Sequence, residues 1–316
     1  MSCHYAALEH ESLLHLQGPD ARTFLQGQVT CDIRRLSASA ALAGSYCTVQ
    51  GRVVCDFLLC ELSPEHLVLR MRRDIRAASA ALFARYIVFS RAKLEAERDD
   101  WRVVACWGAE AARQLQALFG VVPNGKYSAC NGEGFALVQV DEAGEQFECY
   151  LQQGVAAEPL ARIEAELQAA TEPAWQALQV AAGIARIEAG TSGEFIPQML
   201  NYDVTGHISF NKGCYTGQEV VARMHYRGKP KRRLYQAMIE STSLPAAQAP
   251  QAGAALYTGG STQPAGNVVN CVLTGDGDLA LLVTATTSGI DAGLHLAAAD
   301  GPLLRTAEVP YPVPEK

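Results

Sequence analysis

The sequence predicts an α+β protein built of two or three domains. At 316 residues the chain exceeds the length of one ordinary domain, which holds about 100 to 150 residues. Hydrophobic residues make up 49% and charged residues 19%, a balance typical of an ordered globular chain. Runs with strand character alternate with short helical segments as far as residue 169, and only short apolar runs follow Lys231. This change of pattern indicates a separate C-terminal domain.

The first part of the chain alternates strands and short helices. Gly18, Pro19 and Asp20 are typical of a helix start, and Gly27 of its end. A second helix is expected to begin at Asp74, as its N-cap, and to reach residue 86. Strands that pair antiparallel are expected at residues 13–16, 42–49, 52–62 and 67–71.

A second set of elements begins at Lys93. Strands are expected at 101–107, 135–140 and 147–151, and helices at 110–119 and 159–169. Their order, βαββα, predicts a small ferredoxin-like domain.

A further helix, 174–188, is expected to lead into a stretch at 190–228 that is rich in Gly, Asn and Pro and therefore mostly loop. Three apolar runs then follow, separated by Pro, Gly and Ser, and they predict a small β-barrel. They lie at 234–239, 268–273 and 279–284. Residues 245–250 are expected to form an exposed loop and 311–316 a loose tail.

Charge and hydropathy exclude several classes of protein. The net charge of −7 excludes a surface that is basic throughout, so any nucleic-acid site has to be local. The chain contains no run of about 20 apolar residues, and residues 1–16 lack the unbroken apolar run of a signal peptide. A cytoplasmic protein with no membrane partner is therefore expected.

The ten cysteines lie mostly within apolar runs, as Cys55 and Cys106 do, which is typical of reduced thiols in a core. No CxxC pair occurs, and the histidines lack metal-ligand spacing, so no metal site is expected. The sequence also lacks GxSxG, HExxH, P-loop and GxGxxG motifs. Hydrolase, kinase and dehydrogenase functions have no support.

The segment 212–219, Lys-Gly-Cys-Tyr-Thr-Gly-Gln-Glu, has the pattern of a loop that enters a helix. Thr216 and Glu219 have the spacing of a capping box, in which each side chain binds the other residue's backbone N–H. The spacing predicts a helix that starts at Gly217.

Cys214 lies just before this expected helix. The helix dipole and the neighbouring Lys212 would favour its thiolate, so a reactive or ligand-contacting thiol is one interpretation. Gly213 and Gly217 allow close backbone approach, and free amides at a helix start bind carboxylates or phosphates. The alternative interpretation is that Cys214 is a buried small residue beside a glycine turn.

A basic cluster follows, and His225 and Tyr226 are interleaved with its members. Its cations could contact the polyglutamate tail of a folate or the phosphates of an RNA; alternatively, the cluster is a solvated linker. The cluster consists of Arg223, Arg227, Lys229, Lys231, Arg232 and Arg233.

Asp56 is a charged residue within the apolar strand expected at 52–62. A buried carboxylate is costly without a partner, so Asp56 is a candidate contact for a pterin or an amine. The alternative is that strand alternation points it at solvent.

Five motifs in this order resemble the YgfZ family, relatives of the glycine-cleavage T-protein, an aminomethyltransferase. The match extends from about residue 13 to 234, and the last motif is highly specific. The motifs are Phe24-Leu25-Gln26-Gly27-Gln28-Val29-Thr30, Gln50-Gly51-Arg52, Arg85-Tyr86-Ile87-Val88-Phe89-Ser90, Phe195-Ile196-Pro197-Gln198, and Lys212 to Glu219.

The resemblance implies a T-protein-like fold of three domains around a central cavity that binds tetrahydrofolate or a derivative. We therefore expect residues 1–92 plus 172–232 to form a folate-binding core domain, 93–171 an inserted ferredoxin-like domain, and 233–316 a C-terminal small β-barrel. The resemblance also implies a role with iron–sulfur enzymes or assembly factors, including the enzyme that methylthiolates tRNA.

Residue by residue, the resemblance implies Cys214 as the functional thiol and Asp56 in the cavity. The residues it implies as folate contacts are Lys212, Gly213, Tyr215, Gln218 and Arg223. Some family members have an aspartate just before the Gln50-Gly51-Arg52 turn, where this chain has Thr48-Val49. Glu145 is the nearest counterpart of a folate-binding glutamate of T-proteins, but it aligns only with a gap and is not assigned.

The residues and the resemblance leave three candidate functions for this chain. The first is a folate-dependent accessory protein for iron–sulfur enzymes, favoured by the cysteine in the last motif. The second is a folate-dependent aminomethyltransferase in which Asp56 acts on the amine. T-proteins usually lack a cysteine at position 214 and have a longer C-terminal region. The third is a tRNA-binding module, which depends on the basic cluster alone.

Overall fold

The computed structural model describes residues 3–240 and 249–314, and the chain divides into two compact units. The first comprises Met1–Tyr46, Cys55–Glu172 and Asn211–Tyr215, and the second comprises Cys47–Val54, Pro173–Phe210 and Thr216–Lys316. Each unit is therefore assembled from segments that are far apart in the sequence. The boundaries of the three expected domains stay a prediction.

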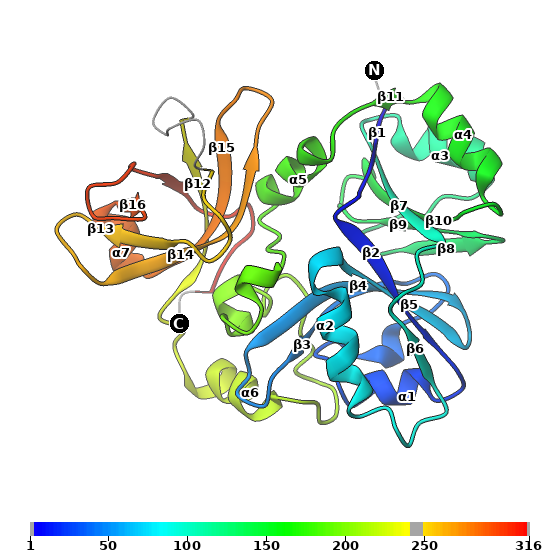
Figure 1. The fold of residues 1–316 in the computed structure, drawn as a ribbon, viewed down its shortest axis with the longest axis horizontal. Coiled ribbons are helices and arrows are strands. Elements are labelled where there is room, and N and C mark those ends of the chain that lie inside the picture. Colours follow the sequence, from blue (N-terminus) through cyan, green and yellow to red (C-terminus); the bar gives the residue numbers. More distant parts are fainter. Residues whose placement is uncertain (1–2, 241–248, 315–316) are drawn as a thin grey trace. The chain divides into compact units, whose positions relative to one another are not determined.

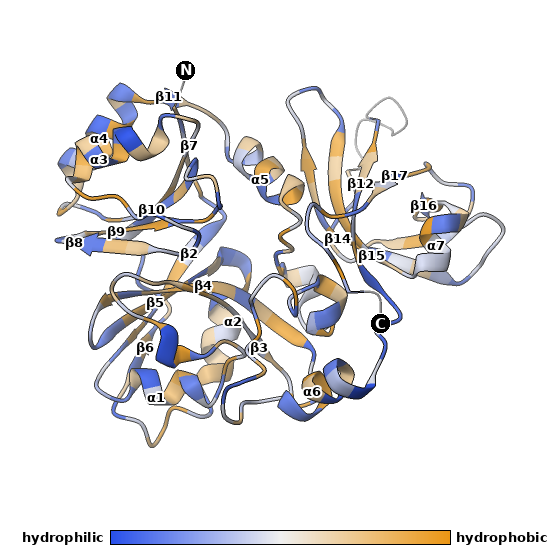
Figure 2. Ribbon diagram, turned by 180° about the vertical axis from the view of Figure 1, so that it is seen from behind, coloured by the Kyte–Doolittle hydropathy of each residue, from blue (hydrophilic) through white to orange (hydrophobic). Residues whose placement is uncertain are grey.

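The first sheet has five strands in the order β3-β4-β5-β2-β6 (Figure 1). These are β3 (Leu42–Cys47), β4 (Val53–Ser63), β5 (His66–Arg72), β2 (Glu11–Gln17) and β6 (Lys93–Glu95). Nine consecutive residues at the start of β4 are buried, so both faces of this strand are covered. Figure 2 shows the apolar colouring along it. The four expected strands are confirmed, and β6 is additional.

Two helices accompany this sheet, α1 (Ala21–Gln26) and α2 (Arg73–Ala84). The N-cap of α2 is Arg72, not Asp74 as expected. Because β5 ends at Arg72 and the helix begins at the next residue, Asp74 lies in the first turn, where its carboxylate is 3.7 Å from Arg72.

The second sheet of the first unit has six strands in the order β11-β1-β7-β10-β9-β8. The expected strands are present as β7 (Trp101–Trp107), β9 (Phe135–Gln139) and β10 (Gln146–Gln152). Three short strands of this sheet were not predicted from the sequence: β1 (His4–Ala7), β8 (Ala129–Gly132) and β11 (Gln168–Ala169).

The N-terminal strand β1 pairs antiparallel with β7 and parallel with β11, so this sheet is not made from residues 93–171 alone. Helices α3 (Ala111–Phe119) and α4 (Ala157–Glu166) lie on one side of it (Figure 1). Leu115 and Ile163 from these helices share a core with Phe147 of the sheet. The ferredoxin-like assignment stays a prediction.

Helix α5 (Glu172–Ala181), nearly all of which belongs to the second unit, is shorter than the helix expected at 174–188. Gly183 has φ +69°, and a Cβ there would lie 2.9 Å from Cε1 of Tyr311, so the chain turns where the helix was expected to continue. Two 3₁₀ turns follow, η2 (Ala189–Thr191) and η3 (Pro197–Leu200), and then α6 (Gln218–Arg227).

The C-terminal sheet is antiparallel, with the strand order β16-β13-β14-β15-β12-β17. The three expected runs correspond to β12 (Arg233–Ile239), β14 (Pro264–Leu273) and β15 (Leu279–Ala285). Four short elements were missed: β13 (Ala255–Thr258), α7 (Thr287–Ala292), β16 (Leu294–Leu296) and β17 (Arg305–Ala307). Closure into a barrel stays a prediction.

The C-terminal segment corrects one expectation and leaves another untested. Tyr311 is not part of a loose tail, because its hydroxyl donates to the Gly183 carbonyl (2.8 Å). Most of the loop expected at 245–250 lies outside the described residues. Within residues 3–240 and 249–314, no helix has the length and apolar character needed to cross a membrane. That same part of the chain holds no group of three or more His, Cys, Asp or Glu that could bind a metal ion.

Candidate functional site

Lys212 fixes the start of the motif, residues 212–215, within the first unit. Its ammonium donates to the backbone carbonyls of Val29 and Cys31, the latter at 2.8 Å, and lies 5.2 Å from the centre of the Tyr215 ring. Lys212 is buried, and this burial lowers its pKa to about 8. An ammonium has three N–H donors, so two are used within the protein and at most one remains for a ligand.

A polar network holds the segment before Lys212. Asp32 accepts from Nε and Nη2 of Arg34 (2.9 and 2.7 Å) and from Nε2 of Gln26 (3.0 Å). The bonds from Arg34, followed by those from Gln26, lower the pKa of Asp32 to about 2 against the effect of burial. Nη2 of Arg34 also reaches the carbonyl of Asn211 (3.4 Å). The first motif, 24–30, thus supports the last one through Gln26 and Val29.

Cys214 is exposed, so the alternative that it is a buried small residue is wrong. All ten cysteines lie in the described part of the chain; seven of them are buried and Cys130 and Cys271 are half-buried. Burial raises the pKa of Cys31 and Cys271 to about 12 and that of Cys130 to about 11. Cys214 is therefore the one fully accessible thiol. The hydrogen bonds of Lys212 go to Val29 and Cys31 rather than to this thiol.

The helix start differs from the expected capping box. Helix α6 begins at Gln218, and its N-cap is Gly217, not Thr216. Gly217 has φ +81°, and a Cβ there would lie 2.3 Å from the Thr48 carbonyl oxygen and 3.1 Å from Cα of Gly51. Because only glycine fits this close approach, backbone packing against the turn between β3 and β4 decides where the helix begins.

Three motifs meet around α6 within the second unit. A Cβ on Gly51 would lie 2.9 Å from Cβ of Val220 in α6. The guanidinium of Arg52 donates to the Glu194 carbonyl, beside Phe195. Nε2 of Gln198 donates to the Val221 carbonyl at 2.9 Å. The segments at 50–52, 195–198 and 217–221 therefore form one packed group.

Gln198 is a residue whose role the sequence did not reveal. It is buried, its carbonyl accepts from Nη1 of Arg233 (2.8 Å), and its side-chain Oε1 has no hydrogen-bond partner among the described residues. The one feature of the sequence that marked Gln198 was its place in the fourth motif, at residues 195–198.

Asp56 lies in β4 with 2% of its surface exposed, so the alternative that it faces solvent is wrong. Its neighbour Cys55 is also buried, and burial raises the pKa of that thiol to about 12. The alternation of side chains along a strand does not predict which residues of β4 are exposed, because β4 is covered on both faces.

The basic cluster separates into two kinds of residue. Arg232 donates to Oδ1 of Asn267 (2.9 Å) and to the Pro264 carbonyl (3.0 Å), and Arg233 forms a two-bond ion pair with Asp203 (2.7 and 3.1 Å). These two side chains are structural. The other four are exposed and form no hydrogen bond or ion pair within residues 3–240 and 249–314: Arg223, Arg227, Lys229 and Lys231.

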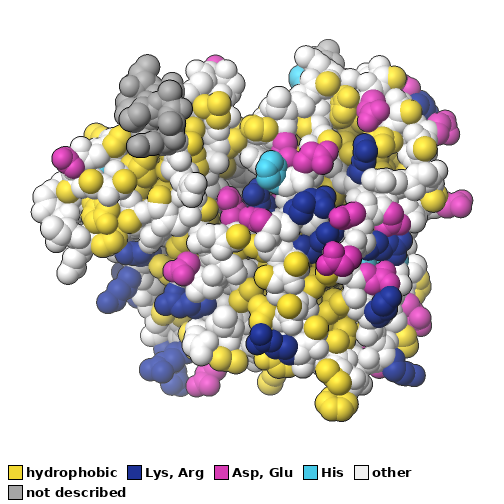
Figure 3. Space-filling model, viewed as in Figure 1, with side chains coloured by type: hydrophobic (Ala, Val, Ile, Leu, Met, Phe, Trp, Pro, Cys, Tyr) yellow, Lys and Arg dark blue, Asp and Glu magenta, His cyan; other side chains and the backbone are white. Residues whose placement is uncertain are grey.

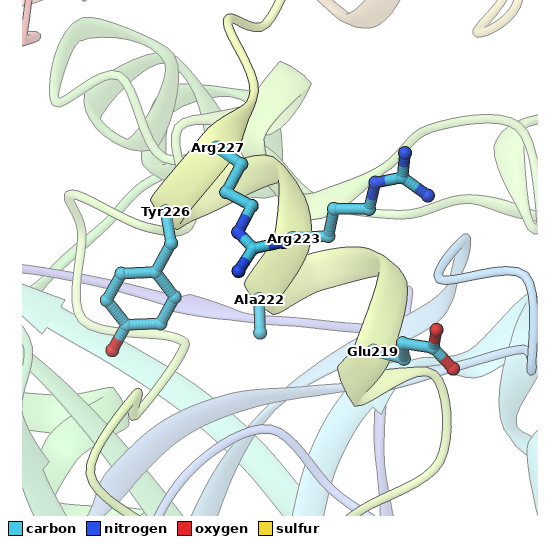
Figure 4. Close-up of a pocket in the computed structure, with 5 residues that line it drawn as sticks. All are labelled: Glu219, Ala222, Arg223, Tyr226 and Arg227. Atoms are coloured by element: carbon cyan, nitrogen blue, oxygen red, sulfur yellow. The ribbon is translucent and has the colours of Figure 1, made fainter.

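Helix α6 also carries a shallow surface pocket of about 330 Å³ (Figure 4). Tyr226 and Arg223 point to opposite sides of it, and the side chain of Arg227 lies between them above Ala222. Glu219 lies at its edge. In Figure 3, Lys and Arg side chains gather over the region of α6 and the segment that follows it.

Comparison with known proteins places the chain in a family. Residues 5–169 match the model of the GCVT N-terminal domain. A "tRNA-modifying protein YgfZ" from Serratia proteamaculans (strain 568) is 30% identical over 97% of this chain and 91% of its own length. The chain belongs to the YgfZ family. Its YgfZ relative from Klebsiella pneumoniae (strain 342), also named a tRNA-modifying protein, is 29% identical over 96% of this chain and 91% of its own length.

The fold resembles that of the T-protein. The crystal structure of the glycine cleavage system aminomethyltransferase T from Bartonella henselae superposes with a TM-score of 0.76. The match covers 97% of this chain and 85% of the other, at 15% sequence identity. The expected kinship of this YgfZ chain with the T-protein is thereby confirmed at the level of the fold.

Proposed function

We propose that this YgfZ-family protein binds tetrahydrofolate or a derivative and supports iron–sulfur enzymes that modify tRNA by methylthiolation. It would act in the cytoplasm as an accessory factor. The observation that carries the proposal is the motif at 212–219: Lys212 anchors it to the carbonyls of residues 29 and 31, and Cys214 beside it is the one exposed thiol. The names of the YgfZ relatives support the link to tRNA.

The chemistry of the motif is suited to an anionic cofactor. Gly213 is exposed and has no side chain, so its backbone is open to close approach. Beyond it, Gln218 begins α6, where free N–H groups attract carboxylates, and the exposed guanidinium of Arg223 lies about one turn further along. In this proposal Lys212 positions the loop and offers at most one N–H to folate, while Tyr215 and Gln218 contact the cofactor.

Calorimetric titration with tetrahydrofolate tests cofactor binding. Lys212→Met should weaken binding because it releases the loop from residues 29 and 31. Lys93→Met, which removes an exposed ammonium paired only with Glu95, is the matched control and should bind as the wild type does. No heat of binding by the wild-type protein would remove the central claim.

The role of Cys214 is tested in cells whose only copy of the gene carries Cys214→Ala. Mass spectrometry of tRNA should show a marked fall in 2-methylthio-adenosine, because the accessible thiol is lost. Cys130→Ala removes a half-buried thiol of raised pKa and should leave the modification unchanged. Equal modification in all three strains would limit Cys214 to a structural role.

A second candidate, folate-dependent aminomethyl transfer, is favoured by the burial of Asp56. A buried carboxylate could hold the amine of the one-carbon donor while folate accepts the one-carbon unit and the amine leaves as ammonia. Formation of methylenetetrahydrofolate from an aminomethyl donor, abolished by Asp56→Asn, would support this reaction over the accessory role. Absence of turnover with the wild-type protein would exclude it.

A further inference from the structure

The face of α6 that carries Tyr226 combines features that recognise single-stranded nucleic acid. Tyr226 is 67% exposed, which is unusual for an aromatic side chain in the middle of a folded domain. It follows Arg223 by three positions and precedes Arg227 by one, and the side chain of Arg227 lies between the Tyr226 ring and Arg223 (Figure 4).

The Tyr226 ring rests on other aromatic side chains. Phe210 and His225 stack with their ring centres 3.7 Å apart and their planes 14° apart. The Tyr226 ring meets them edge to face, at 4.8 Å from His225 and 6.2 Å from Phe210. Contacts of this kind restrict the rotamers of the exposed Tyr226 side chain. Little side-chain entropy would therefore be lost when a ligand stacks on the ring.

The surrounding charge is mainly positive although the chain as a whole carries −7; Glu219 is the one carboxylate among the residues that line the pocket. No Asp or Glu occurs from residue 220 to 233, and four exposed cations in this stretch lack partners within the described residues. A phosphate could bind Arg233 only after its ion pair with Asp203 is broken. Arg223 and Arg227 form no such pair within the described residues, so they can bind a phosphate directly. Both lie on one helix face because they are four residues apart.

We infer that this face of α6 binds a single-stranded segment of RNA. One base stacks on the Tyr226 ring, and the neighbouring phosphates bind Arg227 beside it and Arg223 beyond, both of which line the pocket. Successive bases stack on exposed aromatic side chains while cations follow the backbone in proteins that bind single strands. The inference rests on the tRNA part of the proposed function and names the surface that contacts the RNA. Arg232 and Arg233 are excluded from it because their hydrogen bonds are used within the protein.

Fluorescence anisotropy with a labelled single-stranded RNA of about 12 nucleotides tests the inference. Tyr226→Ala should weaken binding by about tenfold without changing its salt dependence, and Tyr226→Phe should keep most of the affinity because the aromatic face remains. Arg227→Gln should weaken binding. It should also reduce the slope of log affinity against log salt concentration, measured between about 50 and 200 mM, by about one, the value for one lost phosphate contact.

The matched control is Arg102→Gln, which removes an exposed guanidinium from β7, outside the second unit, and should bind as the wild type does. Thermal unfolding of each variant shows that the fold is retained. The inference is overturned by the absence of binding at low salt, by unchanged affinity in Tyr226→Ala, or by an equal loss in Arg102→Gln.

Calorimetry with tetrahydrofolate on the wild-type protein separates the two claims. Folate binding without RNA binding overturns the RNA surface and leaves the cofactor proposal standing. RNA binding without folate binding supports the surface and overturns the cofactor proposal.

Discussion

Cys214 and Lys212 are neighbours in one motif, but their environments differ. Lys212 is buried with its ammonium on two carbonyls, whereas Cys214 is exposed to solvent. The lysine therefore acts on the loop, and the thiol is presented outward by it. One short motif thus combines a buried cation that holds the loop with a thiol that is open to solvent.

The exposure of Cys214 predicts selective alkylation. A thiol reacts as its thiolate, and burial raises the pKa of Cys31, Cys130 and Cys271 and keeps reagents away from them. The native protein treated briefly with iodoacetamide should be labelled at Cys214 alone, as read by peptide mass spectrometry. Cys214→Ser should remain almost unlabelled until it is unfolded. Rapid labelling of a second cysteine in the native protein would contradict this prediction.

At the scale of elements, the start of α6 is set by its contact with the turn between β3 and β4. The helix has no side-chain cap at its N-cap, Gly217, and the close approach of Gly217 to Thr48 and Gly51 takes the place of the expected capping box. The motif containing Gly51 and the motif containing Gly217 thus depend on each other, which neither motif reveals alone.

Gly217→Ala tests this contact. The new Cβ would lie 2.3 Å from the Thr48 carbonyl oxygen, at a φ of +81°. Gly193→Ala is a matched control with the same φ of +81° but no atom within 4 Å of the added Cβ. Backbone strain alone should cost the control about 1 kcal/mol in the free energy of unfolding.

Because the clash adds to this strain, Gly217→Ala should lose about 2 kcal/mol more than the control, as a group forced into a packed interior does. Urea denaturation measures both values. Equal losses in the two variants would mean that the helix start can move away from the turn without cost.

At the scale of the molecule, the two sheets of the first unit are joined by a buried ion pair. Arg70 of β5 binds Glu148 of β10 through two hydrogen bonds, of 2.8 and 2.6 Å, and Tyr150 donates to the same carboxylate at 2.9 Å. Burial, followed by the charge of Glu148, raises the pKa of Tyr150 well above its usual range, so this hydroxyl stays protonated as a donor.

Glu148→Gln should lower the free energy of unfolding by about 3 kcal/mol, because it removes the negative charge that pairs with the buried guanidinium of Arg70 through two hydrogen bonds. Glu110→Gln breaks an exposed ion pair with Arg113 and should cost much less, because solvent screens such a pair. Urea denaturation compares them. A loss in Glu148→Gln no larger than that control would show that the pair does not stabilise the unit.

Acid should destabilise the first unit through His15 and His66. Nδ1 of His15 lies 2.8 Å from Nε2 of His66, and burial lowers the pKa of His15 from 6.5 to about 3 and that of His66 in the same direction. Nearby charges from Arg98, Glu95 and Asp100 act on both. The unfolded chain takes up protons near pH 6.5 while the native state does not, so stability is full above that pH and falls towards pH 3.

The decline in unfolding free energy between pH 7 and pH 4 should therefore be less steep in His15→Gln than in the wild type, as measured by urea denaturation at a series of pH values. His295→Gln, in the C-terminal sheet region, is the control and should keep the wild-type slope. Identical slopes in all three proteins would rule out titration of the buried pair as the cause.

Much of the fold and part of the site could be predicted from the sequence. The long strands β4, β7, β12 and β15 were found because their apolar runs are local and continuous. Short strands such as β1 and β11 were missed, since two to four residues carry too little pattern. The motif at 212–219 was found from its residues, but the support that Gln26, Asp32 and Arg34 give it joins segments far apart in the chain.

The sequence by itself determined the family, the long strands and the glycine-rich motif with its single cysteine, because these depend on residue type and local spacing. Only the tertiary structure decided that Asp56 is buried, that Cys214 is exposed, and which of the six clustered cations are unpaired. Each of these depends on atoms contributed by distant segments. Strand β4 is covered on both faces, Arg233 pairs with Asp203, and Arg232 donates to Asn267. Exposure and pairing are properties of the packed chain, and local spacing does not encode them.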